Sequence, residues 1–299
     1  MVRYIYIFSS GHSGSTLLDL LIGNMSGTVS LGEVKWLPLF LKTHEHCTCG
    51  KPPQTCPFWN PILDELGLAG DTAADQTINA FRLSLEAERN NQLQKLSFYA
   101  RLASAVIHPQ GCAGFGSDAI LKNMIRLYDA VLKTAPAEAV VDSSKSIMTA
   151  QWLRTRLPRN ARVIHLIRDG RAVMASAMRK EVPAERAAKT WLHDNRMAGS
   201  IFRSGPSMNL KALRYEDLCR DPESTMRELA DFLEKPYTED ILHLRGRERH
   251  LIGGNRMRFS GEDKIVNVET WKSRLTEKDL AVFERTAGPL NRKLGYSGT

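Results

Sequence analysis

The sequence predicts an α/β fold in which helices flank a central parallel sheet, and three observations lead to that prediction. Short apolar runs typical of strands alternate along the chain with segments whose apolar residues recur at helical spacing. The runs 2–8 and 163–167 are mostly apolar, as expected for strands that a sheet buries on both faces. A loop follows each run and leads into a helix. No linker forces a division of the chain, so we expect one domain over residues 1–299.

Local sequence gives the reason for each expected element. Apolar, β-branched runs predict strands at 2–8, 140–142, 163–167 and 209–214. Helical spacing predicts helices at 17–25, 34–41, 169–180 and 222–234. The segment 72–134 has no strand-like run and is mostly helical in pattern, with a glycine-rich break at 111–116. We expect this segment to be a helical insertion that forms a lid or a wall of the site at which a substrate binds.

Composition and charge restrict the class of function. The 299 residues are 42% hydrophobic and 25% charged, which excludes a disordered chain, a collagen and a coiled coil. The formal net charge of +8 favours an anionic partner, such as a nucleotide, a nucleic acid, a sulfated or phosphorylated substrate or an acidic membrane. No apolar run is long enough to span a bilayer, and residues 1–8 lack the features of a signal peptide. We therefore expect a cytoplasmic protein without an integral membrane segment.

The loop after the first expected strand has the composition of a phosphate-binding loop. Its residues are Gly11, His12, Ser13, Gly14, Ser15 and Thr16. Glycines allow tight turns that aim successive N–H groups at an anion, while the hydroxyls and the following helix N-terminus add to the attraction. A nucleotide kinase or P-loop NTPase would carry a lysine before the Ser or Thr, but a glycine stands there. The sequence therefore predicts a phosphate loop of another kind.

A second anion site is expected after the strand at 163–167. Arg168 follows this strand directly, at the edge where open α/β sheets bind their ligands. Ser176 lies eight residues further on, a little over two helical turns, so both side chains can face one crevice. A guanidinium together with a hydroxyl suits a phosphate monoester.

Together these two loops resemble those of the sulfotransferase superfamily, whose members use 3′-phosphoadenosine 5′-phosphosulfate (PAPS) as the sulfuryl donor. In that family the first loop binds the 5′-phosphosulfate, and an arginine and a serine at the same spacing bind the 3′-phosphate. His12 stands where the cytosolic branch has lysine, which is similar to the bacterial and tyrosylprotein branches. The resemblance covers about residues 1–35, 138–220 and 250–272. It implies a P-loop-NTPase-like sulfotransferase fold, PAPS as co-substrate and no metal in the reaction.

Three further segments fit this family. The segment YEDL that begins at Tyr215 resembles the family's R-Y-E-D-L, in which the tyrosine contacts adenine. The segment GGNRMR resembles a block that closes over the donor, which would place Arg256 and Arg258 on the donor phosphates. Glu33 follows a glycine at the place where tyrosylprotein and several bacterial members have a general base.

Sulfuryl transfer to a hydroxyl needs a base that takes the acceptor's proton. Glu33 and His12 compete for this role. We favour Glu33, whose pKa partial burial would raise, with His12 as a stabilising group on the donor side. Lys145 follows the expected strand at 140–142 and can neutralise the sulfuryl group, in place of the lysine that His12 replaces.

Five potential metal ligands fall close together in the sequence, namely His44, His46, Cys47, Cys49 and Cys56. Their spacing does not match the two ligand pairs of zinc ribbons and fingers. A small structural zinc site and a Cys49–Cys56 disulfide are both open, but free thiols packed in a proline-rich loop are the favoured interpretation. We expect Cys112 and Cys219 to be ordinary small buried residues.

The function that the resemblance implies is transfer of a sulfuryl group from PAPS to an acceptor hydroxyl or amine by in-line displacement. The alternatives are a P-loop-type nucleotide kinase or NTPase, and a zinc-stabilised nucleic-acid-binding protein suggested by the charge and the Cys/His cluster. We expect a small-molecule, carbohydrate or lipid acceptor and no nucleic-acid partner. The sequence leaves the identity of the acceptor and the oligomeric state open.

Overall fold

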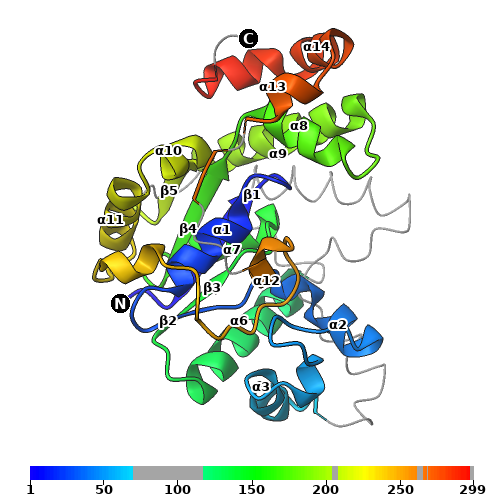
Figure 1. The fold of residues 1–299 in the computed structure, drawn as a ribbon. Helices are drawn as coiled ribbons and strands as arrows, with labels where there is room; N and C mark the ends of the chain where they lie inside the picture. Colours follow the sequence, from blue (N-terminus) through cyan, green and yellow to red (C-terminus); the bar gives the residue numbers. More distant parts are fainter. Residues whose placement is uncertain (70–116, 204–207, 261–264, 268, 297–299) are drawn as a thin grey trace.

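A parallel sheet of five strands, in the order β2-β3-β1-β4-β5, forms the centre of the molecule. The computed structural model describes residues 1–69, 117–203, 208–260, 265–267 and 269–296 (Figure 1). The strands are β1 (Tyr4–Ser9), β2 (Thr28–Ser30), β3 (Ala139–Asp142), β4 (Ala161–Ile167) and β5 (Leu210–Arg214). The predicted fold class is therefore confirmed, with four strands as expected and the short edge strand β2 in addition.

Strand register brings three loops together at one edge of the sheet. Central strand β1 pairs with β3 and β4, so that Tyr6 lies opposite Asp142 and Ser9 lies opposite Leu166. Because all the strands are parallel, the loops that follow β1, β3 and β4 leave the sheet side by side. Two of these loops carry the anion-binding motifs expected from the sequence, and the third carries Lys145.

Helices cover both faces of the sheet. They are α1 (Ser15–Gly23), α2 (Leu37–Thr43), α3 (Trp59–Leu66), α6 (Ser117–Thr134), α7 (Ile147–Arg156), α8 (Gly170–Met178), α9 (Ala184–Arg203), α10 (Tyr215–Arg220), α11 (Pro222–Phe232), α12 (Met257–Ser260), α13 (Trp271–Arg274) and α14 (Glu277–Lys293). The 3-10 turns in the described ranges are η1 (Val34–Trp36), η2 (Pro53–Thr55) and η4 (Glu239–Leu242). None of the helices in the described ranges is both long and apolar enough to cross a membrane.

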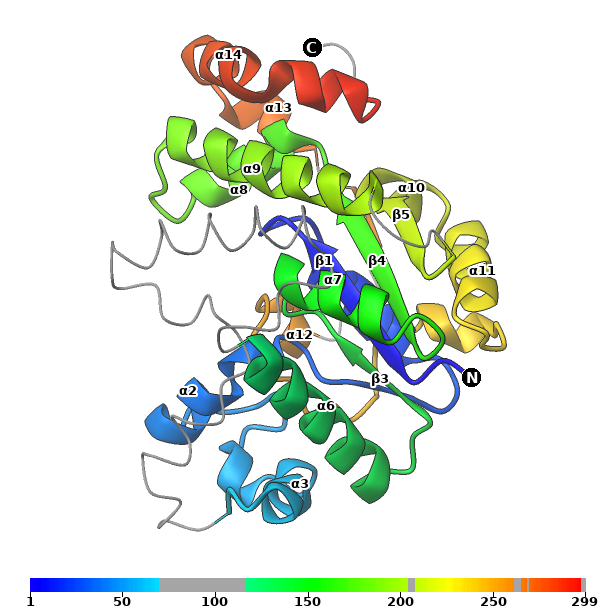
Figure 2. The ribbon, with the colours of Figure 1, turned by 180° about the vertical axis from the view of Figure 1, so that it is seen from behind.

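Side chains of β1 point alternately to the two faces of the sheet, and the hydrophobic core is divided between these faces. Tyr4, Tyr6 and Phe8 pack with α6 and α7, which face the viewer in Figure 2. Ile5 and Ile7 point the other way and pack with α1, which lies in front of the sheet in Figure 1, and with α11. A third cluster joins α8 and α9 to α13 and α14. These layers leave the carboxyl ends of the strands free to build a site.

Two expected segments differ from the structure or fall partly outside it. The helix expected at 34–41 is divided into η1 and α2, because Pro38 begins a new helix at its first turn. Of the expected insertion at 72–134, residues 117–134 form α6, whose Lys133 pairs with Glu65 of α3. The rest of the insertion, with the break at 111–116 and Cys112, lies outside the described residues.

Candidate active site

The loop between β1 and α1 has the backbone shape of an anion cradle. Gly14 adopts φ 92°, and a Cβ added there would lie 2.3 Å from the ring of Tyr215, so only glycine fits. His12 also lies in the left-handed region, at φ 65°. Among the described residues no side chain caps the start of α1. The first-turn N–H groups of this helix are thus available to an anion.

Contacts on both sides hold this loop in place. The Ser10 hydroxyl donates to Asp194 of α9 at 2.7 Å. Thr16 accepts a hydrogen bond from the backbone N–H of Asn255 at 3.1 Å. Ser13 and Ser15 are both buried. The residues expected to bind phosphate, 11–16, therefore lie together at the sheet edge.

Glu33 and Lys145 form an ion pair beside this loop. Their side chains are only 13% and 15% exposed. The backbone N–H of Lys35 donates to the Ser144 hydroxyl at 3.1 Å, which ties the two segments that carry the pair. Both residues are predicted from their own segments, but no pattern in the sequence shows that they touch.

The ion pair reverses the pKa shift expected for Glu33. Burial alone would raise the pKa of this carboxyl, but the charge and hydrogen bond of Lys145 oppose it. Lys35 and the indole of Trp36, which donates to Glu33 Oε2 at 3.3 Å, act in the same direction. The net result is a pKa below its ordinary value, so Glu33 is ionised at neutral pH.

Arg168 lies directly after β4 and contacts the phosphate loop. Its Nη1 donates to the carbonyl oxygen of His12 at 3.1 Å. The guanidinium also stacks on the ring of Tyr215, 4.3 Å from the ring centroid. Its Nε is buried and has no hydrogen-bond partner within the described ranges. A buried guanidinium nitrogen without a partner is expected where an anionic ligand supplies the missing acceptor.

Several cations converge on His12. Burial and the charges of Lys180, Lys145, Arg179 and Arg168 lower the pKa of His12 to about 4, so its imidazole is neutral at neutral pH. Arg179 and Lys180 follow the end of α8, where their charges resemble an ordinary solvated helix terminus. Neither residue was predicted to belong to the site.

Ser176 lies on α8 and is half-buried. Its hydroxyl accepts a hydrogen bond from Arg179 at 2.9 Å. Ser176 is thus linked to the cations that surround the phosphate loop, although it does not contact Arg168 directly.

A glycine turn covers Glu33 from the C-terminal part of the chain. Ile252 accepts a hydrogen bond from the backbone N–H of Glu33 at 2.6 Å. A Cβ added to Gly254 would lie 3.3 Å from the Thr16 hydroxyl and 4.0 Å from Glu33 Oε1, so this turn touches both parts of the site.

The two arginines expected on the donor differ in exposure. Arg256 is exposed, whereas Arg258 is half-buried. Nε and Nη1 of Arg258 are buried and have no partner within the described parts of the chain. Burial lowers the pKa of Arg258, and the nearby charge of Glu33 opposes that shift.

Two buried aspartates link the elements that carry the site through hydrogen bonds. Asp19 accepts hydrogen bonds from the hydroxyls of Ser30 at 2.7 Å and Ser143 at 2.9 Å. Asp142 accepts from the hydroxyl of Tyr128 at 2.6 Å. Burial raises the pKa of Asp19 to about 7 and that of Asp142 to about 6. Neither aspartate was predicted to belong to the site, although an aspartate among the leucines of α1 is a usable signal.

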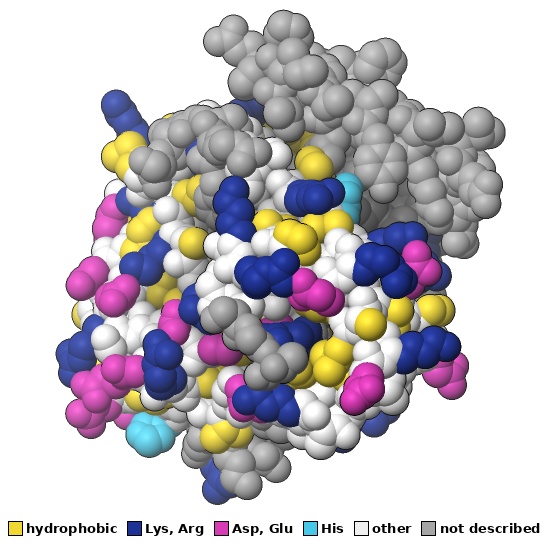
Figure 3. Space-filling model, turned by 90° about the horizontal axis from the view of Figure 1, so that it is seen from above, with side chains coloured by type: hydrophobic (Ala, Val, Ile, Leu, Met, Phe, Trp, Pro, Cys, Tyr) yellow, Lys and Arg dark blue, Asp and Glu magenta, His cyan; other side chains and the backbone are white. Residues whose placement is uncertain are grey.

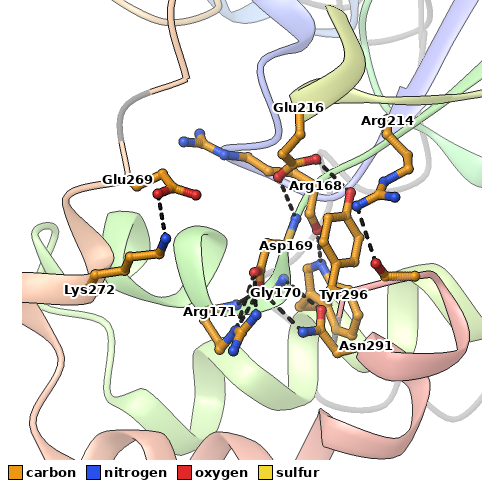
Figure 4. A network of polar contacts seen from close by, with 12 residues as sticks. Arg168, Asp169, Gly170, Arg171, Arg214, Glu216, Glu269, Lys272, Asn291 and Tyr296 are labelled. Atoms are coloured by element: carbon orange, nitrogen blue, oxygen red, sulfur yellow. Dashed lines mark hydrogen bonds and ion pairs between the residues drawn. The ribbon is translucent and has the colours of Figure 1, made fainter. Parts of the chain in front are cut away.

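Asp169 holds the C-terminal helix against the corner between β4 and α8 (Figure 4). It accepts from the backbone N–H of Arg171 at 2.9 Å and pairs with its guanidinium. Asn291 of α14 donates to Asp169 at 3.2 Å and accepts from the N–H of Gly170 at 3.0 Å. The Arg171 guanidinium stacks on Trp271, 4.3 Å from the ring centroid. The residues that directly follow Arg168 therefore stabilise the packing of α14 at this corner.

A cavity of about 430 Å³ lies next to this network, lined by Asp169, Arg171, Ala172, Arg214, Glu216, Cys219, Arg220, Asn267, Glu269, Trp271, Lys272, Gly295 and Tyr296.

Figure 3 shows the molecule from above, where lysine and arginine side chains are spread over the surface with carboxylates between them. The charge on this face is thus mixed.

Comparison with known proteins identifies similar chains. A model described as "Sulfotransferase family" matches residues 5–239. A putative protein-tyrosine sulfotransferase of Caenorhabditis briggsae is 28% identical over 172 residues, which are 51% of this chain and 59% of the relative. Human carbohydrate sulfotransferase 3 is 27% identical over 161 residues, 45% of this chain and 33% of the relative. These matches thus span about half of the chain and between a third and three fifths of the relatives.

Two solved structures share the fold of this chain. The sulfotransferase domain from the curacin biosynthetic pathway superposes with a TM-score of 0.56 at 18% identity, covering 100% of this chain and 99% of that one. The sulfotransferase domain from the Synechococcus PCC 7002 olefin synthase gives 0.55 at 18% identity, covering 100% and 96%.

Proposed function

Since this chain belongs to the sulfotransferase family, we propose that it transfers a sulfuryl group from PAPS to an acceptor hydroxyl or amine. The observation that carries the proposal is the buried Glu33–Lys145 pair beside an uncapped phosphate loop. A base and a cation at one point are what in-line transfer to a protic acceptor requires.

The donor would lie along the carboxyl edge of the sheet. Residues 11–16 would hold the 5′-phosphosulfate through their backbone N–H groups and hydroxyls. Arg168 and Ser176 would bind the 3′-phosphate, which would supply an acceptor for the unpartnered Nε of Arg168. Tyr215 packs between Gly14 and Arg168, so it would contact the adenosine mainly through its ring edge and hydroxyl.

The glycine turn and its arginines would close the donor site. Arg258 has buried guanidinium nitrogens without partners in the described ranges, and it lies near Glu33. Its charge would therefore face the phosphosulfate. Arg256 is exposed and would reach the donor only when the turn closes over it.

Transfer would proceed by one displacement at sulfur. The acceptor oxygen forms a bond to sulfur while the bond from sulfur to the phosphate oxygen breaks. Glu33 takes the proton of the acceptor, and Lys145 leaves Glu33 to neutralise the oxygens of the sulfuryl group and the leaving phosphate. Without donor the two side chains neutralise each other, so donor binding would free the base.

His12 would act on the donor side. Its pKa of about 4 without ligand reflects burial and the surrounding cations. A bound polyanion offsets those cations and raises the pKa, which favours a hydrogen bond from the imidazole to the leaving phosphate.

Thermal unfolding with 3′-phosphoadenosine 5′-phosphate (PAP), the expected product, tests the donor class without knowledge of the acceptor. A ligand present at about 100 times its Kd stabilises the folded state by about 2.7 kcal/mol. We expect PAP to raise the Tm and equal concentrations of ATP and ADP to raise it much less. A Tm that ATP raises as much as PAP does would contradict the proposal and favour a nucleotide kinase or NTPase.

A further inference from the structure

Three cysteines and a histidine from distant parts of the sequence meet in one cluster. The Sγ atoms of Cys47 and Cys49 lie 2.9 Å apart, and each lies 3.5 Å from Sγ of Cys56. Nδ1 of His250 lies 3.2 Å from Sγ of Cys56. All four ligand atoms fall within 4.8 Å of one another. His44 and His46, the histidines adjacent in sequence, are exposed and do not take part.

We propose that Cys47, Cys49, Cys56 and His250 bind a structural zinc ion. Three thiolates and one imidazole are a common tetrahedral ligand set for zinc, and soft sulfur ligands disfavour magnesium and calcium. Zinc bonds to sulfur of about 2.3 Å place the sulfur atoms of a tetrahedral site about 3.8 Å apart. The sulfur atoms, now 2.9–3.5 Å apart, would move apart when the ion binds. Four protein ligands leave no position open for substrate, so the site is structural.

Partners outside the ligand set orient His250 for this role. Its Nε2 lies 3.4 Å from a carboxylate oxygen of Glu248, while Nδ1 points to the cluster. A carboxylate on the far nitrogen is the usual arrangement for a histidine that binds zinc. The ring stacks on Phe58 with centroids 5.1 Å apart and an interplanar angle of 3°.

A disulfide would use only two of the three sulfur atoms. A disulfide would also not explain why His250, with Glu248 on its other ring nitrogen, lies against Cys56.

Zinc at this position would fix the segment that leads to the glycine turn over Glu33. Thr48 accepts a hydrogen bond from the N–H of Leu251 at 2.9 Å, and the indole of Trp59 donates to the carbonyl of His250 at 2.6 Å. Ile252, which follows Leu251, accepts a hydrogen bond from the backbone N–H of Glu33. The ion would therefore position the active-site turn while it takes no part in the transfer, and the inference holds whichever acceptor is used.

Metal analysis of the full chain, purified without chelators from zinc-supplemented cells, tests the site. We expect about one zinc per chain in the wild type and in Cys219→Ser, whose thiol lies outside the cluster. Cys49→Ser and His250→Ala should lose most of the zinc. Zinc-free wild type, equal zinc in Cys49→Ser and Cys219→Ser, or a disulfide among the three cysteines by intact mass would overturn the proposal.

A second measurement on the wild type guards against variants that fail to fold. A mercurial reagent that titrates thiols should release the zinc into a chromogenic chelator, and cobalt in its place should show the spectrum of tetrahedral thiolate ligation. After the zinc is released, the amides of Leu251 and Ile252 should exchange hydrogen at least ten times faster than in the zinc-bound protein. Unchanged exchange after zinc release would refute the positioning role.

Discussion

Lys145→Met removes one partner of the ion pair with Glu33 and keeps the length of the apolar stem. The side chains are 15% and 13% exposed, so the variant leaves a largely buried carboxylate without its counter-charge. Removal of one partner from a buried pair costs about 3–5 kcal/mol, and the remaining exposure places the expected loss at about 3 kcal/mol. Lys133→Met is the matched control, because its pair with Glu65 is 67% and 37% exposed. It should cost only about 0.2–1 kcal/mol.

The assay is urea unfolding of both variants at about pH 7 and about pH 4. In the wild type the pKa of Glu33 is below its ordinary value. Its contribution to the free energy of unfolding is therefore present above that ordinary value and lost as the pH falls through the lowered pKa. In Lys145→Met the effect of burial, which raises the pKa, is opposed only by Lys35 and Trp36, so the pKa of Glu33 rises from its wild-type value and its ionisation stabilises the fold less. The deficit of the variant should be largest at neutral pH and shrink as the carboxyl becomes protonated.

A double-mutant cycle completes the test. Glu33→Gln combined with Lys145→Met leaves neither charge buried alone, so the two losses should not add. A deficit of Lys145→Met that is equal at both pH values, or losses that add fully, would refute the ion pair as the origin of the lowered pKa.

The remaining predictions concern ligand binding and turnover. Glu33→Gln should bind PAP normally and lose on the order of 10²–10⁴ in turnover, measured as single-turnover transfer from PAPS to the acceptor that the wild type uses; full turnover in Glu33→Gln with none in His12→Ala would make His12 the base. Arg168→Ala should weaken PAP binding by about 2–4 kcal/mol in calorimetry, and unchanged affinity would remove the second anion site. Gly14→Ala should abolish PAP binding because a Cβ would lie 2.3 Å from an aromatic ring, whereas Gly11→Ala meets no atom within 4 Å and should fold normally; equal PAP affinity in the two variants would contradict the cradle.

Local chemistry explains which parts of this site could be predicted. The phosphate loop and the Arg168 corner each lie in one short segment, and the order of strand, loop and helix shows where they must lie in a parallel sheet. The Glu33–Lys145 contact depends instead on β2 and β3 being neighbours, which no local pattern states. The pKa of Glu33 was expected to rise for that reason, since its counter-charge comes from another loop.

Other features were hidden by short length or by long separation in sequence. Strand β2 has only three residues, too few for a periodic signal, yet it places Ser30 on Asp19. His250 lies 194 residues from Cys56, so the four-ligand cluster could not be found from spacing, and the nearer His44 and His46 were plausible but wrong companions.

The backbone at His12 and Lys145 has a consequence for the evolution of this site. Both residues adopt left-handed conformations, with φ 65° and φ 62°, and neither is glycine. Such a conformation costs about 1–2 kcal/mol for a residue with a Cβ. The charge of Lys145 acts on the imidazole of His12, so the two strained residues carry side chains that influence each other across adjoining loops. Local backbone strain is thus accepted at the two positions that bring an imidazole and an ammonium to the same site.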